Sequence, residues 1–158
     1  MINKEELRLF LNKADRPHAD GTANIVREQN GSSTIEFADG EWRMNDNFYG
    51  GEPYGGRQVV YHKGSPVWMC VYYGWIEQSV GNVKLIYDFL RLSLQHAPVN
   101  GFSRGPGVFT DGKLEYKNHA KGDISNYSGK EVISTGGKDV YYAYYLGGLV
   151  DQRNRGDY

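Results

Sequence analysis

The sequence predicts an α+β fold: two tandem repeats, each of one helix and four strands, whose antiparallel sheets are flanked by the two helices about a pseudo-two-fold axis. Two segments have the apolar spacing of amphipathic helices, and most other apolar residues alternate with polar ones, as in half-buried strands. The order of these elements occurs twice. The 158 residues include 21 Gly and 13 Tyr, which is typical of one domain with many turns and aromatic strands.

The first helix begins at the N-terminus. Asn3 can cap it, and Glu6 lies where a capping box places an acidic residue. Apolar residues then follow at helical spacing: Leu7, Phe10, Leu11 and Ala14. We expect the helix to end at Arg16, because the residue before a proline resists the helical region and Pro17 follows.

Two hairpins follow in the first half. Asp39 and Gly40 form a tight turn between two short alternating segments, 35–37 and 42–44. A glycine-rich link at 48–56 leads to a longer hairpin with arms at 58–62 and 67–76.

The second helix shows the strongest pattern. Asn82 caps it, and Pro98 and Gly101 stop it. Its apolar residues cover a wide face, which indicates deep burial: Val83, Ile86, Tyr87, Phe89, Leu90, Leu92 and Leu94. Two hairpins follow again, the first around Asp111 and Gly112 and the second with arms at 131–134 and 140–146.

An internal repeat links the two halves. Residues 54–76 align with 127–149 without a gap and share seven identities in 23 positions, and 37–44 resembles 109–116. We therefore predict a first repeat at 1–78, a second at 79–150 and a polar tail at 151–158, within one compact domain. Each repeat would leave one apolar face uncovered, so we expect the copies to dock face to face and to form a crevice, where small-molecule sites tend to occur.

The two longest strands suggest a binding site. Both are apolar on both faces, so we expect them to be central and covered on both sides. Each carries an aromatic–small–aromatic pattern, which would form a slot with aromatic walls, although the small residue can equally serve to admit a helix. Aromatic walls with a carboxylate suit a cationic or heteroaromatic molecule. The predicted ligand-binding residues are Trp68, Tyr72, Tyr141, Tyr145, Glu52 and Glu131.

Catalytic motifs are weak. Residues 101–105 spell G-x-S-x-G, but here a helix precedes and a strand follows Ser103, the reverse of a nucleophile elbow. A turn is the simpler interpretation, from which Arg104 could reach an anion. Cys70 has only His62 as a nearby candidate base, and a buried free cysteine usually behaves as a small hydrophobic residue.

The charge balance narrows the classes of partner. The net charge is −1, with 18 basic and 19 acidic side chains, which argues against a nucleic-acid partner. The single cysteine, Cys70, excludes an internal disulfide and a cysteine-based zinc site, and the four histidines lack metal-ligand spacing, so we expect no metal or other cofactor. Without an apolar run of membrane-spanning length or a signal-peptide pattern in residues 1–6, we expect a cytoplasmic protein with no membrane partner.

The stretches 45–61 and 64–74 resemble an uncharacterised bacterial domain family, whose members occur alone or C-terminal to Xre-type helix-turn-helix regulators. The matching positions are Asp46, Phe48, Gly50, Tyr54, Gly56, Val59, Pro66, Val67, Trp68, Tyr72, Gly74, Gly129, Glu131, Ile133, Gly147 and Gly148. The resemblance implies no established activity, and the regulator fusions imply a sensing or interaction role.

Three functions stay open. The leading hypothesis is a non-catalytic, sensor-like domain that binds a small molecule or a peptide in the aromatic slot. One alternative is a small hydrolase or transferase that acts through carboxylates or Ser103. Another is a protein-interaction or oligomerisation domain, including a homo-oligomer, that uses exposed tyrosines as anchors.

Overall fold

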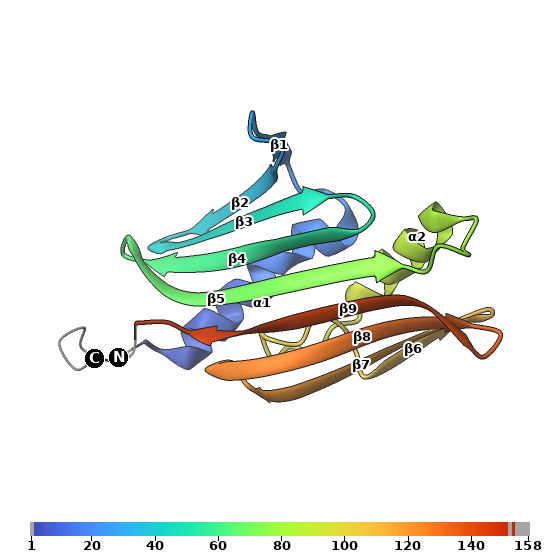
Figure 1. Ribbon diagram of the computed structural model, residues 1–158. Helices are drawn as coiled ribbons and strands as arrows, with labels where there is room; N and C mark the ends of the chain where they lie inside the picture. Colours follow the sequence, from blue (N-terminus) through green and yellow to red (C-terminus); the bar gives the residue numbers. More distant parts are fainter. Residues whose placement is uncertain (1, 152, 154–158) are drawn as a thin grey trace.

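The computed structural model describes residues 2–151 and 153 and contains two helices and nine strands. The predicted mixed α+β class is correct, with strand predominating (Figure 1). The predicted tail at 151–158 lies mostly outside the described residues. In chain order the elements are α1 (Lys4–Asp20), β1 (Ile25–Arg27), β2 (Ser33–Asp39), β3 (Trp42–Gly50), β4 (Tyr54–His62), β5 (Ser65–Ile76), α2 (Val83–Leu94), β6 (Val108–Asp111), β7 (Leu114–Asp123), β8 (Asn126–Thr135) and β9 (Lys138–Leu149).

All nine strands form one antiparallel sheet in the order β1-β2-β3-β4-β5-β9-β8-β7-β6. The expectation that two sheets dock face to face is therefore wrong. The halves join side by side through β5 and β9, where Tyr72 pairs with Tyr145. This junction satisfies the backbone hydrogen bonds of two strands that would otherwise be exposed sheet edges.

The two long hairpins have corresponding registers. β4 pairs with β5 so that Gln58 lies opposite Cys70, and β8 pairs with β9 so that Glu131 lies opposite Ala143. The register shifts between Val60 and Tyr61 in β4 and between 133 and 134 in β8. Each bulge thus falls two residues after the Gln58 or Glu131 position.

Helix α1 is longer than predicted. The Asn3 side chain accepts hydrogen bonds from the backbone of Glu5 and Glu6, which confirms the cap. However, the helix runs through Pro17 to Asp20. Pro17 lies in the last turn, where little helix is left to disrupt, and its carbonyl accepts the bonds that close the helix from residues 22 and 23.

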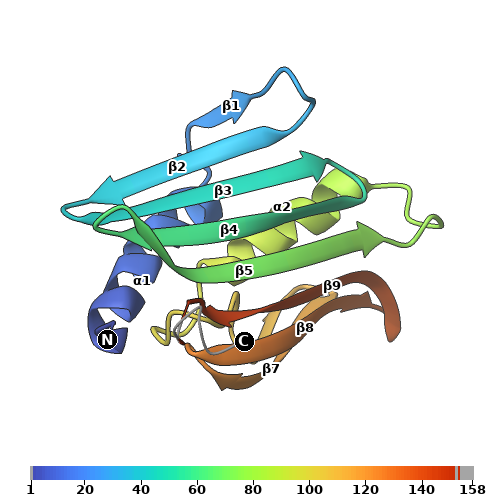
Figure 2. The ribbon, with the colours of Figure 1, turned by 60° about the vertical axis from the view of Figure 1, so that its left-hand side comes forward.

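Both helices cover the same face of the sheet (Figure 2). α1 packs on the first half and α2 on the second, and each forms its own apolar cluster with the strands beneath it. Asn82 caps α2 as predicted. Of the helices in the described residues, none combines the length and apolarity needed to cross a bilayer.

Neither α1 nor α2 lies over the opposite face of the sheet (Figure 2). β5 and β9 are central, as predicted, but the expectation that they are covered on both faces is wrong. Val71, Tyr73, Tyr144 and Leu146 are 36–57% exposed. Apolar residues on both faces of a strand show that it is central, but they do not show what covers the second face.

Candidate functional site

A group of polar side chains lies at the middle of the helix-covered face, where the two halves meet. We call it the central cluster, and it comprises Asp15 of α1, Asp46 of β3, Tyr54 and Gln58 of β4, Tyr72 of β5, Arg104 of the α2–β6 loop and Glu131 of β8. Its members range from fully buried Glu131 to exposed Asp15, so water reaches one side of it.

The α2–β6 loop, residues 95–107, delivers Arg104 into the cluster. The Asn100 side chain accepts hydrogen bonds from the backbone of Phe102 and Ser103, which sets the turn. Gly105 then lies against the Tyr116 ring, where an added Cβ would be 2.2 Å from the hydroxyl oxygen. Glycine at this position is what allows the loop to approach the sheet closely.

The Arg104 guanidinium occupies an aromatic and acidic environment. Its Nε atom lies 3.3 Å from Oε2 of Glu131, its centre is 5.3 Å from the ring centroid of Tyr72, and its Nη2 atom is 3.5 Å from the Tyr54 hydroxyl. The anion that Arg104 reaches is therefore a carboxylate of the same chain. Glu131 also accepts a hydrogen bond of 2.6 Å from Tyr116, while its Oε2 atom accepts none from the described residues.

Two further carboxyl groups lie beside Arg104. Asp46 accepts a hydrogen bond of 2.5 Å from the Tyr72 hydroxyl, and Asp15 accepts one of 2.6 Å from Gln58. Burial raises the pKa of Asp46 despite the Tyr72 bond. The Asp15 residue is exposed to solvent on one side, but protein atoms surround its carboxyl group. The resulting desolvation, together with a smaller repulsion from Asp46, raises the pKa of Asp15 to about 6.

His18 lies one helical turn after Asp15 on the same side of α1. Its side chain is accessible to solvent, yet protein atoms crowd the ring. This desolvation, followed by the positive charges of Arg104 and Arg91, lowers the pKa of His18 to about 4. The imidazole is therefore neutral at pH 7, and the cluster's charge is carried by its carboxyl groups and Arg104.

Three of the predicted site residues belong to this network. Tyr72 and Glu131 contact Arg104 directly, and the Tyr141 hydroxyl lies 2.7 Å from that of Tyr54. Tyr145 lies beside Tyr72 in register and donates to Asn118 at 2.9 Å. Three of these residues are only 0–1% exposed: Tyr141, Tyr145 and Glu131. They therefore lie beneath the solvent-accessible side of the site.

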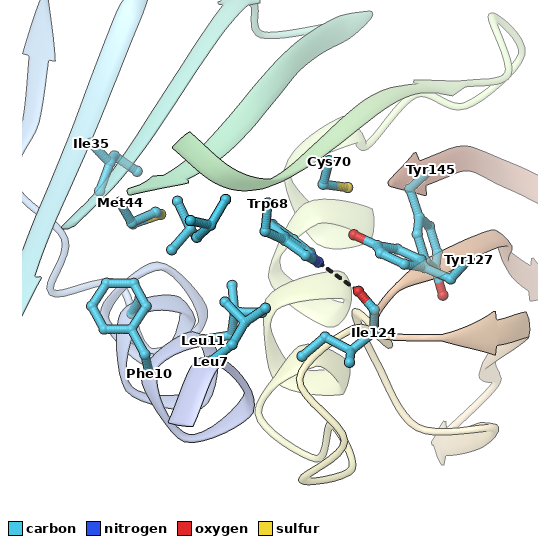
Figure 3. Close-up of a cluster of buried hydrophobic side chains, with 13 residues drawn as sticks. Leu7, Phe10, Leu11, Ile35, Met44, Trp68, Cys70, Ile124, Tyr127 and Tyr145 are labelled. Carbon is cyan, nitrogen blue, oxygen red and sulfur yellow. Dashed lines mark hydrogen bonds between the residues drawn. The ribbon is translucent and has the colours of Figure 1, made fainter. Parts of the chain in front are cut away.

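The remaining two predicted site residues, Trp68 and Glu52, lie outside the central cluster. Trp68 is 2% exposed and donates from Nε1 to the carbonyl of Ile124 at 3.0 Å, inside the α1 core (Figure 3). Glu52 is exposed at the opposite end of β5, where it accepts hydrogen bonds from the backbone of Ile76 and from Tyr87. Figure 3 shows the predicted aromatic wall at Trp68 as part of a filled core.

Two surface hollows lie outside this cluster. One of about 510 Å³ is lined by polar residues of 28–34, β3 and β4, and one of about 520 Å³ lies between the start of α2 and turns of the second half. None of the six predicted ligand-binding residues lines either hollow.

Asp15, Asp46 and Gln58 were missed, although a pattern points to each. Asp46 alternates with buried Met44, and Gln58 with buried Val60, so both are polar residues on the inward side of a strand. Asp15 continues the apolar spacing of α1 four residues after Leu11. In each case a polar residue occupies a position where the pattern calls for an apolar one, and this mismatch could have indicated a functional residue.

Among the described residues, neither candidate nucleophile has a hydrogen bond to a histidine or a carboxylate. The Ser103 hydroxyl donates to the Gly105 carbonyl at 3.0 Å and accepts from Asn118 at 2.9 Å. Burial raises the pKa of Cys70 to about 11, and His62 lies four residues beyond the position opposite Cys70 in the β4–β5 register. Within residues 2–151 and 153, no group of three or more His, Cys, Asp or Glu side chains has an arrangement that could hold a metal ion.

Comparison with known proteins gives one match. The model of a domain of unknown function, DUF5680, matches residues 46–150, from the middle of β3 to the end of β9. No curated protein and no solved structure matches the chain. The matched segment contains most of the central cluster and excludes α1, and it covers well over half of the sequence; the chain belongs to the DUF5680 family of domains of unknown function.

Proposed function

We propose that this chain is a non-catalytic, sensor-like binding domain, and that the central cluster binds a small molecule through a cationic nitrogen. The observation that carries the proposal is the charge count of the cluster. Asp15, Asp46 and Glu131 supply three carboxyl groups against one guanidinium, Arg104, which is paired with Glu131. A cation beside Asp15 and Asp46 would relieve their repulsion.

The Arg104 contacts indicate which chemistry suits the cluster. The planar cation of Arg104 lies over the Tyr72 ring and faces a carboxylate, and these are the contacts that aromatic and acidic sites offer to amidinium or ammonium groups. Asp15 and His18 lie on the solvent-accessible side, so a ligand would enter past α1. The neutral ring of His18 adds no competing positive charge at pH 7.

Binding rather than catalysis fits the hydrogen bonds of the candidate nucleophile. The Ser103 proton is committed to a backbone carbonyl, which cannot act as a general base. Ser103 therefore serves to hold the loop that carries Arg104.

The location of the cluster fits a duplicated domain. We propose that the halves are copies of one α-β4 unit related by a pseudo-two-fold axis between Tyr72 and Tyr145, and that β1 is an additional edge strand of the first half. An offset of 73 residues relates these two tyrosines, which pair with each other, and the same offset relates the bulges at Val60 and Ile133. The axis would pass beside the cluster, which is where ligands of duplicated domains are expected.

Three compounds of similar shape test the ligand class: benzamidine (a cation), benzamide (neutral) and benzoate (an anion). We expect benzamidine alone to raise the melting temperature at pH 8, and the rise to shrink at pH 5, because protonation of Asp15 removes its negative charge. The variants Asp15→Asn and Asp46→Asn should abolish the benzamidine shift. Asp39→Asn is the matched control, because Asp39 is an exposed carboxylate paired with Lys13 away from the cluster. Equal shifts with benzamidine and benzamide, or full binding by both cluster variants, would refute the proposed site.

A further inference from the structure

The uncovered face of the sheet carries an apolar stripe along its two central strands. Val71 pairs with Leu146 and Tyr73 with Tyr144, and all four side chains are exposed. We call this set, with Trp75 and Tyr142, the outer stripe. Figure 2 shows that neither helix lies over this face. A contiguous apolar surface in the middle of a sheet marks an interaction site, unlike scattered exposed residues.

One end of the outer stripe is a preformed aromatic surface. The Trp75 ring centroid lies 5.3 Å from that of Tyr142, 5.9 Å from Tyr73 and 6.0 Å from Tyr144. These rings support one another, so little conformational entropy remains to be lost on binding. β5 and β9 are already paired on both sides, so a partner must bind through side chains and cannot add a strand.

Positive charges flank the stripe on both sides. Arg57 of β4 lies opposite Val71, and Lys130 of β8 lies opposite Tyr144 with its Nζ atom 5.5 Å from the Tyr142 and Tyr144 rings. The carboxylates further out on this face have cations of their own: Glu36 pairs with Arg43, and Glu115 pairs with Lys117. The Tyr142 end has acidic groups nearby, Asp139 and Glu77.

We propose that the outer stripe is a docking surface for a segment of a partner protein whose apolar side chains are flanked by carboxylates. Charge complementarity selects this occupant, because the apolar side chains would cover Tyr73 and Tyr144 while the carboxylates meet Arg57 and Lys130. A second copy of the chain fits less well, since a face-to-face pair places the same cations against one another. Single-stranded nucleic acid also fits less well, because Val71 and Leu146 offer no ring for stacking and the net charge is −1.

Synthetic peptides test the proposal directly. The probe is a labelled peptide in which phenylalanine and leucine alternate with glutamate, and the control keeps the apolar residues but has lysine in place of glutamate. Fluorescence anisotropy should show at least about tenfold tighter binding of the acidic peptide. Tyr73→Thr/Tyr144→Thr should weaken that binding about tenfold, and Lys130→Glu should weaken it for the acidic peptide alone.

The controls keep the test decisive. Tyr49→Thr removes a tyrosine that is 52% exposed on the same face but outside the stripe, and it should leave the affinity unchanged. Circular dichroism melting establishes that each variant is folded. Equal binding of the two peptides, or unchanged binding by the double tyrosine variant, would overturn the proposal. So would a dimer in sedimentation that Tyr144→Thr dissociates, or tighter binding of an oligothymidine than of the acidic peptide.

Discussion

The two halves of the sheet make the same contacts at corresponding positions but distribute charge differently. In the first half the Tyr72 hydroxyl donates to Asp46, and in the second the Tyr145 hydroxyl donates to Asn118. Each tyrosine passes over a glycine of the neighbouring strand, where an added Cβ would clash with it. The contact needs only an acceptor oxygen and space for a ring, so the acid at one position and the amide at the other are free to serve different purposes.

A second pair of positions reverses the charge. Gln58 occupies the β4 position that corresponds to Glu131 of β8, and each contacts the side chain at the matching place on the next strand, the Met44 sulfur or the Tyr116 hydroxyl. The second half therefore keeps its carboxylate deep and paired with Arg104, whereas the first half keeps Asp46 nearer to water. The carboxylate that pairs with Arg104, Glu131, therefore lies in the second half, whereas the carboxylates proposed to bind a ligand, Asp15 and Asp46, lie in the first.

The two helices, α1 and α2, also differ at one corresponding position, where one is acidic and the other apolar. Buried residues of α1 fall at Leu7, Phe10, Leu11 and Ala14, and those of α2 fall with the same spacing at Ile86, Phe89, Leu90 and Ser93. The next position is buried Leu94 in α2 but Asp15 in α1. The α2 end is therefore packed, whereas the α1 end is open and acidic and exposes Asp15 to solvent.

Exchanging the hydrogen-bond acceptors of Tyr72 and Tyr145 should give the largest change in the free energy of unfolding. Asn118 is 7% exposed and donates to Ser103 and to the Gly105 carbonyl, so Asn118→Asp loses two donors and buries a charge. We expect a loss of about 3 kcal/mol in the free energy of unfolding at pH 7. Asp46→Asn, the reciprocal change, should cost no stability at pH 7, because the Tyr72 hydroxyl keeps an acceptor and burial already disfavours the Asp46 charge. Urea titration of both variants measures the difference, and equal losses would contradict the division of charge between the halves.

Exchanging Gln58 and Glu131 should change the free energy of unfolding by a smaller amount. Glu131→Gln removes the carboxylate that is paired with the Arg104 guanidinium while keeping an acceptor for Tyr116, so we expect a loss of about 2 kcal/mol in the free energy of unfolding. Gln58→Glu places a carboxylate beside Asp15 at a partly exposed site, where repulsion should cost about 1 kcal/mol at pH 7. The double variant Arg104→Met/Glu131→Leu should recover stability relative to Glu131→Gln. Chemical denaturation at pH 7 checks this order, and a larger loss for Gln58→Glu would contradict it.

Much of this arrangement follows from local pattern, and the rest does not. Helix spacing, the turns at Asp39 and Asp111, and the aromatic strands are set by neighbouring residues, so the sequence predicts them. Pairing of β5 with β9 depends on two strands about 70 residues apart, and alternation of side chains does not distinguish an edge-to-edge junction from face-to-face packing. Tyr72 was predicted for the site because it lies on β5, and Glu131 because it is an acidic residue near the aromatic residues of the second half. Asp15 joins them only through the placement of α1, a tertiary contact that no local motif encodes.

Asp15→Asn should increase stability, which distinguishes a binding residue from a structural one. Burial and repulsion raise its folded pKa to about 6 from an ordinary value of 3.8, so the native state holds more protons than the unfolded state between these pH values. Stability therefore falls as pH rises through this window, and the penalty is fully present above pH 6. Because Asp15 is largely exposed, solvent screening limits the gain for Asp15→Asn to about 1 kcal/mol at pH 8, with none at pH 3. Melting curves at the two pH values measure this, and a variant less stable than the parent at pH 8 would show that the carboxylate has a structural role.

His18 should give the smallest effect, with the opposite dependence on pH. Its folded pKa is lowered to about 4 from 6.5, so the native state holds fewer protons than the unfolded state between these values. Its contribution to stability is complete above pH 6.5 and is lost as pH falls toward 4. His18→Gln should therefore match the parent at pH 7.5 and exceed it by about 0.5 kcal/mol at pH 4.5, a value reduced by the exposure of the ring. His96→Gln is the control, because His96 lies beyond the end of α2 and stacks on Phe109 away from the cluster. If the two variants had the same pH dependence, neither the desolvation of the His18 ring nor the positive charge of Arg104 could be the cause, and the contrast between an open α1 end and a packed α2 end would lose its electrostatic support.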